Sequence, residues 1–369
     1  MTTNQGSSSK KGLPSDIDQL RVVWRYELLK YLRSRRLLAS IAIVVAVLAL
    51  IYILPPVAGS PYRGHETDSH VNVIPTDIPF GAVTFQGYGV LKSGKIDLNS
   101  LVLYVNGTEF PSSSGANWIF VESISVPGIP ISGNAVLFLQ NVTGSTVTAS
   151  YKWHTSVQDF DTLFVNFASI LIVICATFFG ADSIVGEFQN RTGYLMFPNP
   201  LRRSVLYFGK YAASMTAGIA VLALFYVGIG ALSLGTVGGI DDDFGVSFAF
   251  AAEYLMAVMA IAYLISSILK GSTGALVLTF FMFIMILPII DSASMFAGVK
   301  ISASLTFSSN AMLYSLSDPY PHDSVNSDFG ITIHQYYPDQ AMAAIVMFVY
   351  AAVAIVFSLL LFKRKQLSG

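Results

Sequence analysis

Long apolar runs separated by polar segments dominate the pattern along the chain. An α-helix rises 1.5 Å per residue, so about 20 apolar residues cross the hydrocarbon core of a bilayer. Only Lys270 and Gly271 separate the fourth run from the fifth, so these two can also be read as one long broken helix. The pattern predicts an α-helical polytopic membrane protein with six transmembrane helices. We expect them at 37–54, 162–181, 211–235, 246–269, 272–290 and 341–362.

A different rhythm fills residues 55–160, between the first two apolar runs. Short stretches such as 101–105 (Leu-Val-Leu-Tyr-Val) and 146–151 alternate as strands do, and turn signals such as Asn106-Gly107 separate them. About seven short strands at roughly ten-residue spacing predict a small antiparallel β-sandwich. Asn106 and Asn141 begin Asn-X-Thr tripeptides, which can accept glycans but also occur by chance. A second polar and aromatic segment, 291–340, is expected to hold short helices.

The N-terminal leader has two parts. Residues 1–15 are polar and are expected to form a disordered tail. From 16 to 36, apolar positions share one helical stripe and basic residues stand off it, which predicts an amphipathic helix lying on an anionic membrane surface. The alternative is a simple basic flank of the first span. The stripe consists of Ile17, Leu20, Trp24, Leu28 and Tyr31.

Charge supports the membrane interpretation and gives an orientation. Hydrophobic residues make up 53% of the chain and charged residues 12%, whereas a soluble domain carries roughly 25% charged residues. With the N-terminus inside, segments 1–36, 182–210 and 363–369 and the turn at Lys270 hold 16 of the 21 Lys and Arg residues. We therefore expect a plasma-membrane protein with both termini in the cytoplasm, a β-rich extracytoplasmic insert at 55–160, and no nucleic-acid partner. Residues expected to anchor it at the lipid interface are Trp24, Arg33, Arg35, Arg36, Lys210, Lys363, Arg364 and Lys365.

Two stretches imitate enzymatic motifs and fail on inspection. The run from Gly89 to Lys95 matches most of a P-loop, but Ile96 stands where a magnesium-binding hydroxyl is needed, and the run is expected outside the cell. His65 and His70 are five residues apart, about 140° round a helix, whereas a zinc-binding helix needs its histidines four apart. We therefore expect no catalytic residue, metal or cofactor on this chain. All five histidines are expected outside, so a surface metalloenzyme remains an alternative.

Three acidic residues lie at or near the ends of the predicted spans. Glu253 lies near one end of the fourth run, and Asp161 and Asp291 lie at the edges of others. A carboxylate inside a membrane is a functional candidate by default. Glu253 is expected to be shallow enough to reach water, so ion coupling through it is the weaker reading. Cys175 is the one cysteine, so no disulfide can form within the chain.

The segment 182–210 carries the most informative pattern. Glu187 and Arg191 are four residues apart, the spacing of an ion pair on a helix, and aromatic residues follow. Pro198 and Pro200 break the helix, and basic residues precede the next span. A short helix that presents aromatic side chains between basic residues predicts a docking element for a cytoplasmic partner. The alternative is an ordinary long loop.

The order of these features resembles the ABC-2 type (type V) ABC transporter permeases. The shared features are an acidic-basic helix, Thr192-Gly193 (usually Gly-Thr in the family), then proline, arginine and a final Gly209-Lys210. The turn at 269–276 and the leader are similar to the family's tight hairpin and elbow helix, whereas the insert matches by position only. The resemblance implies that the docking residues are Glu187, Phe188, Arg191, Thr192, Gly193, Tyr194, Leu195, Phe197 and Arg203.

The resemblance also implies a function. The chain would be the permease subunit of an exporter powered by a separate ABC ATPase subunit, which holds ATP and magnesium, and it would pair with a second permease copy. The alternative is a non-transporting membrane receptor or scaffold that uses the insert to bind a partner. The substrate does not follow from the pattern, because one sequence does not fix which helix faces line a cavity.

Overall fold

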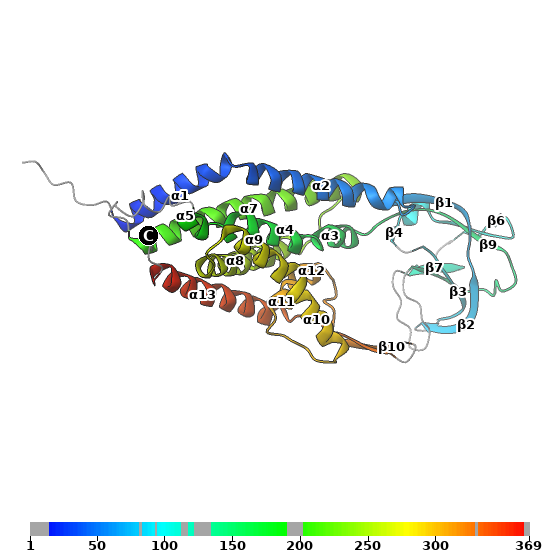
Figure 1. Cartoon of the computed structure of the whole chain (residues 1–369). Coiled ribbons are helices and arrows are strands. Elements are labelled where there is room, and N and C mark those ends of the chain that lie inside the picture. Colours follow the sequence, from blue (N-terminus) through cyan, green and yellow to red (C-terminus); the bar gives the residue numbers. More distant parts are fainter. Residues whose placement is uncertain are drawn as a thin grey trace, which may run out of the picture. The chain divides into compact units, whose positions relative to one another are not determined.

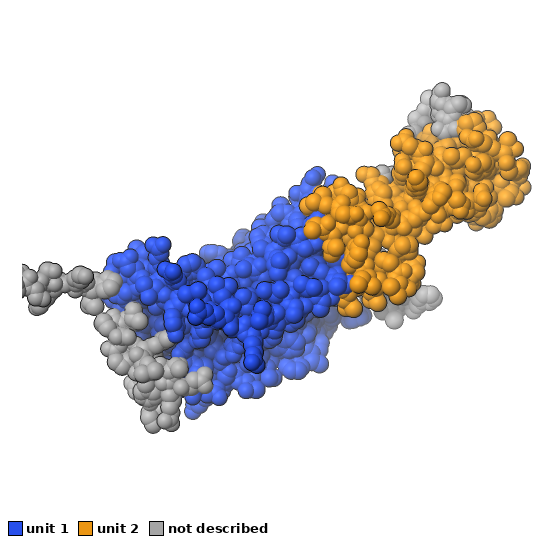
Figure 2. Space-filling view, turned by 90° about the horizontal axis from the view of Figure 1, so that it is seen from above, with its two compact units in different colours: residues 1–49, 162–230, 241–369 blue, residues 50–161, 231–240 orange. Residues whose placement is uncertain are grey.

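The computed structural model describes residues 15–80, 83–92, 94–111, 117–121, 134–189, 202–328 and 331–364. The chain divides into two compact units, which Figure 2 shows in different colours. Unit 1 comprises Met1–Ala49, Thr162–Gly230 and Asp241–Gly369, and unit 2 comprises Leu50–Asp161 and Ala231–Ile240.

Among the described residues, six helices are long and apolar enough to cross a membrane, as the apolar pattern predicts (Figure 1). α8 and the helix from Val157 to Gln189 bury the largest share of their apolar residues and form the interior of unit 1. α2 and the helix from Ser272 to Ser294 bury the smallest share, so most of their apolar side chains face outward. The six are Arg35–Val57 (α2), Val157–Gln189, Arg203–Thr236 (α7), Phe244–Ile268 (α8), Ser272–Ser294 and Gln340–Arg364 (α13).

Two of these helices contain π-helical segments, which the apolar pattern does not predict. The second comprises α3 (Val157–Val165), α4 (Ala168–Ala176), the π segment η3 (Thr177–Ala181) and α5 (Val185–Gln189). The fifth comprises α9 (Ser272–Phe281), the π segment η4 (Met282–Ile286) and α10 (Leu287–Phe296). Because π segments interrupt the regular hydrogen-bond ladder, they are frequent at functional sites. Both lie beside the polar groups described below.

Helix α1 (Asp16–Leu32) precedes the first span and packs on α7. Ser15 caps it by accepting a hydrogen bond from the Asp18 amide. Its buried positions are Gln19, Val23, Glu27 and Tyr31, each four residues after the last. The face that packs on the protein therefore differs from the predicted apolar stripe: it shares Tyr31 with the stripe and includes two polar residues, whereas Ile17 of the stripe is 78% exposed.

Unit 2 contains two antiparallel sheets built from the segment predicted to be rich in strands. One has the order β1-β9-β5-β6, with β4 on β9, and the other has the order β2-β3-β8-β7. Leu103 and Val147 of the first sheet share a buried cluster with Val136 and Phe138 of the second, as in a sandwich. The strands are β1 (Arg63–His70), β2 (Val73–Phe80), β3 (Val83–Val90), β4 (Lys95–Ile96), β5 (Val102–Val105), β6 (Thr108–Glu109), β7 (Trp118–Val121), β8 (Ala135–Phe138) and β9 (Val147–His154).

Two edge strands of unit 2 differ from the inner ones in composition. β1 has no apolar alternation and pairs with β9 through its backbone, so the hydrophobic pattern does not reveal it. β2 carries Pro75 and Pro79, which is allowed because one of its sides has no strand partner among the described residues.

Between α10 and α13, unit 1 has two short helices, α11 (Leu305–Ser309) and α12 (Ala311–Tyr314), and a hairpin of β10 (Ser324–Asp328) and β11 (Ile331–Gln335).

A polar cluster on the first sheet leads to a prediction on pH. Glu66 Oε1 accepts hydrogen bonds from Lys92 Nζ at 3.0 Å and from Trp153 Nε1 at 3.2 Å. Lys92 Nζ also lies 4.2 Å from the centre of the Trp153 ring. The hydrogen bond from Lys92 keeps the pKa of Glu66 below its usual value.

Glu66→Gln is expected to lower the unfolding temperature of unit 2 by a few degrees at pH 7, because an exposed ion pair contributes about 0.2–1 kcal/mol. A carboxyl group whose pKa is lowered by folding stabilises the fold above its unfolded pKa and loses that effect as the pH falls through its folded pKa. The difference between wild type and Glu66→Gln should therefore vanish in acid. Thermal unfolding followed by Trp118 and Trp153 emission in a Trp24→Phe background measures it, and a difference that persists in acid would contradict this account.

Candidate functional site

Residues 182–187, which we call the hub segment, connect η3 to the first turn of α5 and bond to five helices. Glu187 contacts α1 and α7, and Asp182 contacts α2 and α9. The backbone amides of Ile184 and Val185 both donate to Ser266 Oγ on α8, which supplies an acceptor for two amides at the buried start of α5. Six residues thus hold the positions of five helix ends.

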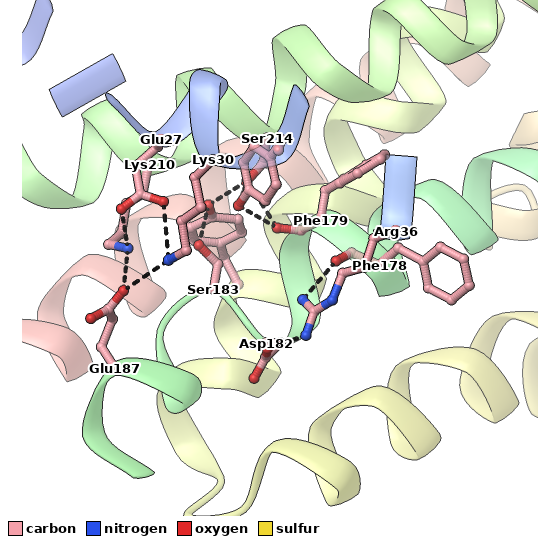
Figure 3. A network of polar contacts seen from close by, with 12 residues as sticks. Glu27, Lys30, Arg36, Phe178, Phe179, Asp182, Ser183, Glu187, Lys210 and Ser214 are labelled. Carbon is pink, nitrogen blue, oxygen red and sulfur yellow. Dashed lines mark hydrogen bonds and ion pairs between the residues drawn. The ribbon is translucent and has the colours of Figure 1, made fainter. Parts of the chain in front are cut away.

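A cluster of four charged side chains forms the first part of the site (Figure 3). Lys210 Nζ of α7 lies 2.7 Å from Glu27 Oε1 of α1 and 2.8 Å from Glu187 Oε1 of the hub segment. Lys30 Nζ lies 3.4 Å from Glu187 Oε1 and 3.6 Å from Glu27 Oε2. The side chains of Lys210 and Glu27 are 3% and 2% exposed, whereas that of Lys30 is 54% exposed. The two carboxylates and two ammonium groups balance, as buried charges require.

Hydroxyl groups form the second part of the site. Tyr31 of α1 bonds to Ser214 of α7 at 2.9 Å, and Ser214 bonds to Tyr263 of α8 at 2.7 Å. Tyr263 bonds in turn to Ser183 of the hub segment, again at 2.7 Å. The carbonyl oxygen of Phe179 in η3 lies 3.0 Å from the Tyr31 hydroxyl oxygen and 2.9 Å from Ser214 Oγ, so it can accept a hydrogen bond from either hydroxyl. The chain of hydroxyls satisfies polar groups buried among α1, α7 and α8 and fixes their relative positions.

The third part connects α2 and α9 to the hub segment. Arg36 Nη2 lies 2.6 Å from Asp182 Oδ2, and Arg36 Nη1 donates to the carbonyl oxygen of Phe178. Ser272, the first residue of α9, donates its hydroxyl to Asp182 Oδ1. Asp182 therefore joins the starts of two predicted spans. Figure 3 shows Arg36, Phe178 and Asp182 together with the charged cluster.

Close backbone packing brings α1 onto α7 next to the charged cluster. A Cβ atom at Gly209 would lie 2.6 Å from Val23 Cγ1 and 2.8 Å from Val23 Cβ, closer than real Cβ atoms approach. Only glycine therefore allows α1 to approach α7 this closely. The neighbouring Lys210 then reaches Glu27, four positions after Val23 on the same face of α1.

The structure changes the interpretation of two expected docking residues. The side chain of Glu187 is 13% exposed and pairs with Lys210 and Lys30. It therefore attaches the start of the predicted docking segment to α7 and α1. Phe188 was expected on an uncovered surface, which is wrong: its ring packs edge-on against Phe362 of α13, at 6.2 Å between ring centres. Arg203 donates to the carbonyl oxygen of Lys363. The others, namely Arg191, Thr192, Gly193, Tyr194, Leu195 and Phe197, lie outside the described residues.

Among the residues expected at the lipid interface, the prediction for Lys210 is wrong. It cannot face lipid headgroups, because its ammonium is buried between two carboxylates of the protein. Trp24 is half-buried and donates its indole N–H to Thr216 of α7 at 3.1 Å. Arg36 is committed to Asp182. Arg33, Arg35, Lys363 and Arg364 are exposed, as an interface role requires, and Lys365 lies outside the described residues.

Several residues of the site were missed by the sequence analysis. Glu27 is an acidic residue in a basic segment, and the one signal for its role is its spacing of four from Val23 and Tyr31, which places all three on one face of α1. Asp182, Ser183, Ser214 and Tyr263 carried no signal, because single polar residues at span ends are common. Their partners lie on other helices, at separations along the chain that no local pattern records.

Comparison with protein families identifies what kind of chain carries this site. The family model described as "ABC-2 family transporter protein" matches residues 21–367, nearly the whole sequence. The chain belongs to this family. It is therefore a multi-pass membrane component of a transporter, as the resemblance implied. No curated protein matches the chain.

The enzymatic alternatives gain no support from the geometry. Among the described residues, no group of three or more His, Cys, Asp and Glu side chains is placed to hold a metal ion. Gly89 and Lys95 of the near-match to a P-loop lie in strands β3 and β4, whereas a P-loop precedes a helix.

Proposed function

We propose that the chain is the transmembrane permease subunit of an exporter that is powered by a separate ABC ATPase subunit and contains a second permease copy. Family membership supports a transporter component, and the clustering of Lys and Arg supports a cytoplasmic location for segment 182–210. In this proposal ATP and magnesium are bound by the partner subunit. This chain contributes the helices that move.

The observation that carries the proposal is the bond between Glu187 and Lys210. Glu187 directly precedes segment 188–209 and Lys210 directly follows it, so their ion pair holds the two ends of the segment together; we call these joined ends its base. Glu27 attaches the same base to α1, and the hub segment attaches it to α2, α8 and α9. A push by a partner on residues 190–201 would therefore act on several helices together. Such a rigid-body shift is how an ATPase would bias the helices between inward- and outward-facing arrangements.

Co-purification tests the partner. The tagged full-length chain is isolated in mild detergent from the membranes of its own cells, and vanadate-sensitive ATP hydrolysis is measured in the eluate. Glu187→Arg is expected to reduce this activity at least tenfold, because it places a third cation beside Lys210 and Lys30 and opens the base of the segment. Tyr194→Ala, within the predicted docking segment, should reduce it while leaving the base intact.

The matched control is Glu109→Arg, the same substitution on an exposed strand of unit 2, which should leave the activity unchanged. Wild-type eluates without ATP hydrolysis would refute the ATPase partner. Full activity in both Glu187→Arg and Tyr194→Ala would refute the docking role. Substrate movement into inside-out vesicles that depends on ATP separates an exporter from a receptor that only binds through unit 2.

A further inference from the structure

Unit 1 contains a pocket whose lining shares no residue with the hub segment. Its volume is about 290 Å³, and it is lined by residues of α4, α8, η4, α10 and α11. The walls are mainly apolar, with Ile170, Val173 and Phe283 among them, and Asp291 is the acidic residue of the lining. Asp291 also lines a neighbouring pocket of about 320 Å³ beside Tyr350 of α13. Neither lining includes Lys, Arg or His among the described residues.

The carboxylate of Asp291 is only half satisfied by the protein. Oδ2 accepts a hydrogen bond from Thr306 Oγ1 at 2.5 Å. Oδ1 is buried and has no hydrogen-bond partner among the described residues. Leaving a buried carboxylate oxygen unpaired costs free energy. Asp291 also lies within the helix from Ser272 to Ser294, which is apolar enough to cross a membrane, and a carboxylate there is costly in itself. Such a cost persists most readily where a ligand repays it.

We propose that this pocket binds the ammonium group of a small organic amine, with Asp291 as its counter-ion. An ammonium group brings a positive charge and three N–H donors to linings in which Asp291 is the acidic residue and no cationic side chain accompanies it among the described residues. The attached hydrocarbon lies against Ile170, Val173 and Phe283, and the ring of Phe283 adds attraction for a cation over its face. A divalent metal fits less well, because neither pocket lining includes a second acidic residue beside Asp291 among the described residues. The inference concerns binding by this chain alone, so it stands or fails independently of the proposed function.

The probe is 2-phenylethylammonium, which combines a ring with an ammonium group, and 2-phenylethanol is its neutral match. Binding to the full-length chain in a neutral detergent is measured by titration calorimetry at pH 7. We expect Asp291→Asn to weaken binding of the ammonium about tenfold or more, since it removes a charge-assisted hydrogen bond. It should leave the weak binding of 2-phenylethanol unchanged.

Controls separate binding from folding. Asparagine keeps an oxygen that accepts from Thr306, so Asp291→Asn preserves the contact between α10 and α11. Thr306→Val removes that contact but retains the carboxylate, and it should bind the ammonium at least as well as Asp291→Asn does. Glu253→Gln, the same kind of change on α8 at a residue outside both pocket linings, should bind as wild type does. Equal affinity of wild type and Asp291→Asn, or binding of 2-phenylethanol as tight as that of the ammonium, would overturn the proposal.

The source of the ammonium group is a separate arm of the experiment. The chain is reconstituted in vesicles of phosphatidylglycerol, with or without phosphatidylethanolamine. Competition by phosphatidylethanolamine against the probe would support the site with a lipid headgroup as its occupant. Binding that is indifferent to this lipid would support the site with a soluble amine as its occupant. Loss of probe binding in both vesicles would count against the site.

Discussion

Lys210→Met is expected to destabilise unit 1 by about 3 kcal/mol, because removing one partner of a buried ion pair leaves an uncompensated buried charge. Glu27 would keep its carboxylate at 2% side-chain exposure with only the distant contact to Lys30 at 3.6 Å. Glu187 would lose its closest cation. We expect the apparent unfolding temperature in detergent to fall by about 10 °C.

The cluster also predicts an order among variants. Glu27→Gln should cost less than Lys210→Met, because Lys210 then still has Glu187 at 2.8 Å. The double variant Glu27→Gln with Lys210→Met should recover part of the loss, since it removes the buried charge that the single variant leaves behind. Arg202→Met is the matched control: its ion pair with Asp16 is exposed, and its loss should shift the unfolding temperature by little.

Trp24 offers a direct readout for these variants. Its indole bonds to Thr216 of α7, so its emission reports the contact between α1 and α7. Replacing Trp118 and Trp153 by phenylalanine leaves Trp24 as the single tryptophan. Unfolding temperatures of Lys210→Met and Arg202→Met that agree within error would show that the buried cluster does not hold α1 on α7.

The parts of the fold that were predictable follow from strong local constraints. A membrane span must satisfy its own backbone and expose apolar side chains, so each of the six helices leaves an apolar run in the sequence. The sandwich of unit 2 leaves alternation in β5 and β9, because one face of each strand is buried. Strand β1 was not predicted, because it lacks apolar residues and pairs with β9 through its backbone.

The candidate site was predictable only in outline. The position of segment 182–210 and its Gly209-Lys210 ending were visible, whereas the direction of the Lys210 side chain was not. A lysine beside a span is expected at the lipid interface by default. Whether it turns inward depends on Glu27, 183 residues away, and on the close packing that Gly209 permits. The π segments leave no periodic signal in the sequence, because each occupies only about one turn within a longer helix.

Gly209 and Lys210 together hold α1 against α7. Glycine lets α1 lie against α7, and lysine neutralises the glutamate that this contact buries. The pair carried part of the resemblance to ABC-2 permeases, and its geometry supplies a physical reason for that order of residues. Either residue without the other would leave α1 poorly held, through a steric clash or through an unpaired charge.

Gly209→Val is therefore expected to displace α1 from α7 and to destabilise unit 1 by about 1–3 kcal/mol, the usual cost of overpacking. The new Cβ would meet Val23 Cγ1 at 2.6 Å in every rotamer, because the position of the Cβ atom does not depend on the side-chain torsions. The displacement should also separate Lys210 from Glu27, so the loss of the buried pair adds to the clash. Trp24 emission should shift toward that of a solvent-exposed indole.

Gly235, on the same helix, is the matched control, because a Cβ there meets nothing within 4 Å. Gly235→Ala should be neutral or stabilising by up to about 1 kcal/mol, since alanine favours a helix more than glycine does. Gly209→Ala should be destabilising despite the same gain in helix propensity. Val23→Ala removes the contact at 2.6 Å but keeps the one at 2.8 Å, so it should rescue Gly209→Ala only in part. If Gly209→Ala and Gly235→Ala change the unfolding temperature in the same direction, close packing of α1 on α7 is not what Gly209 provides.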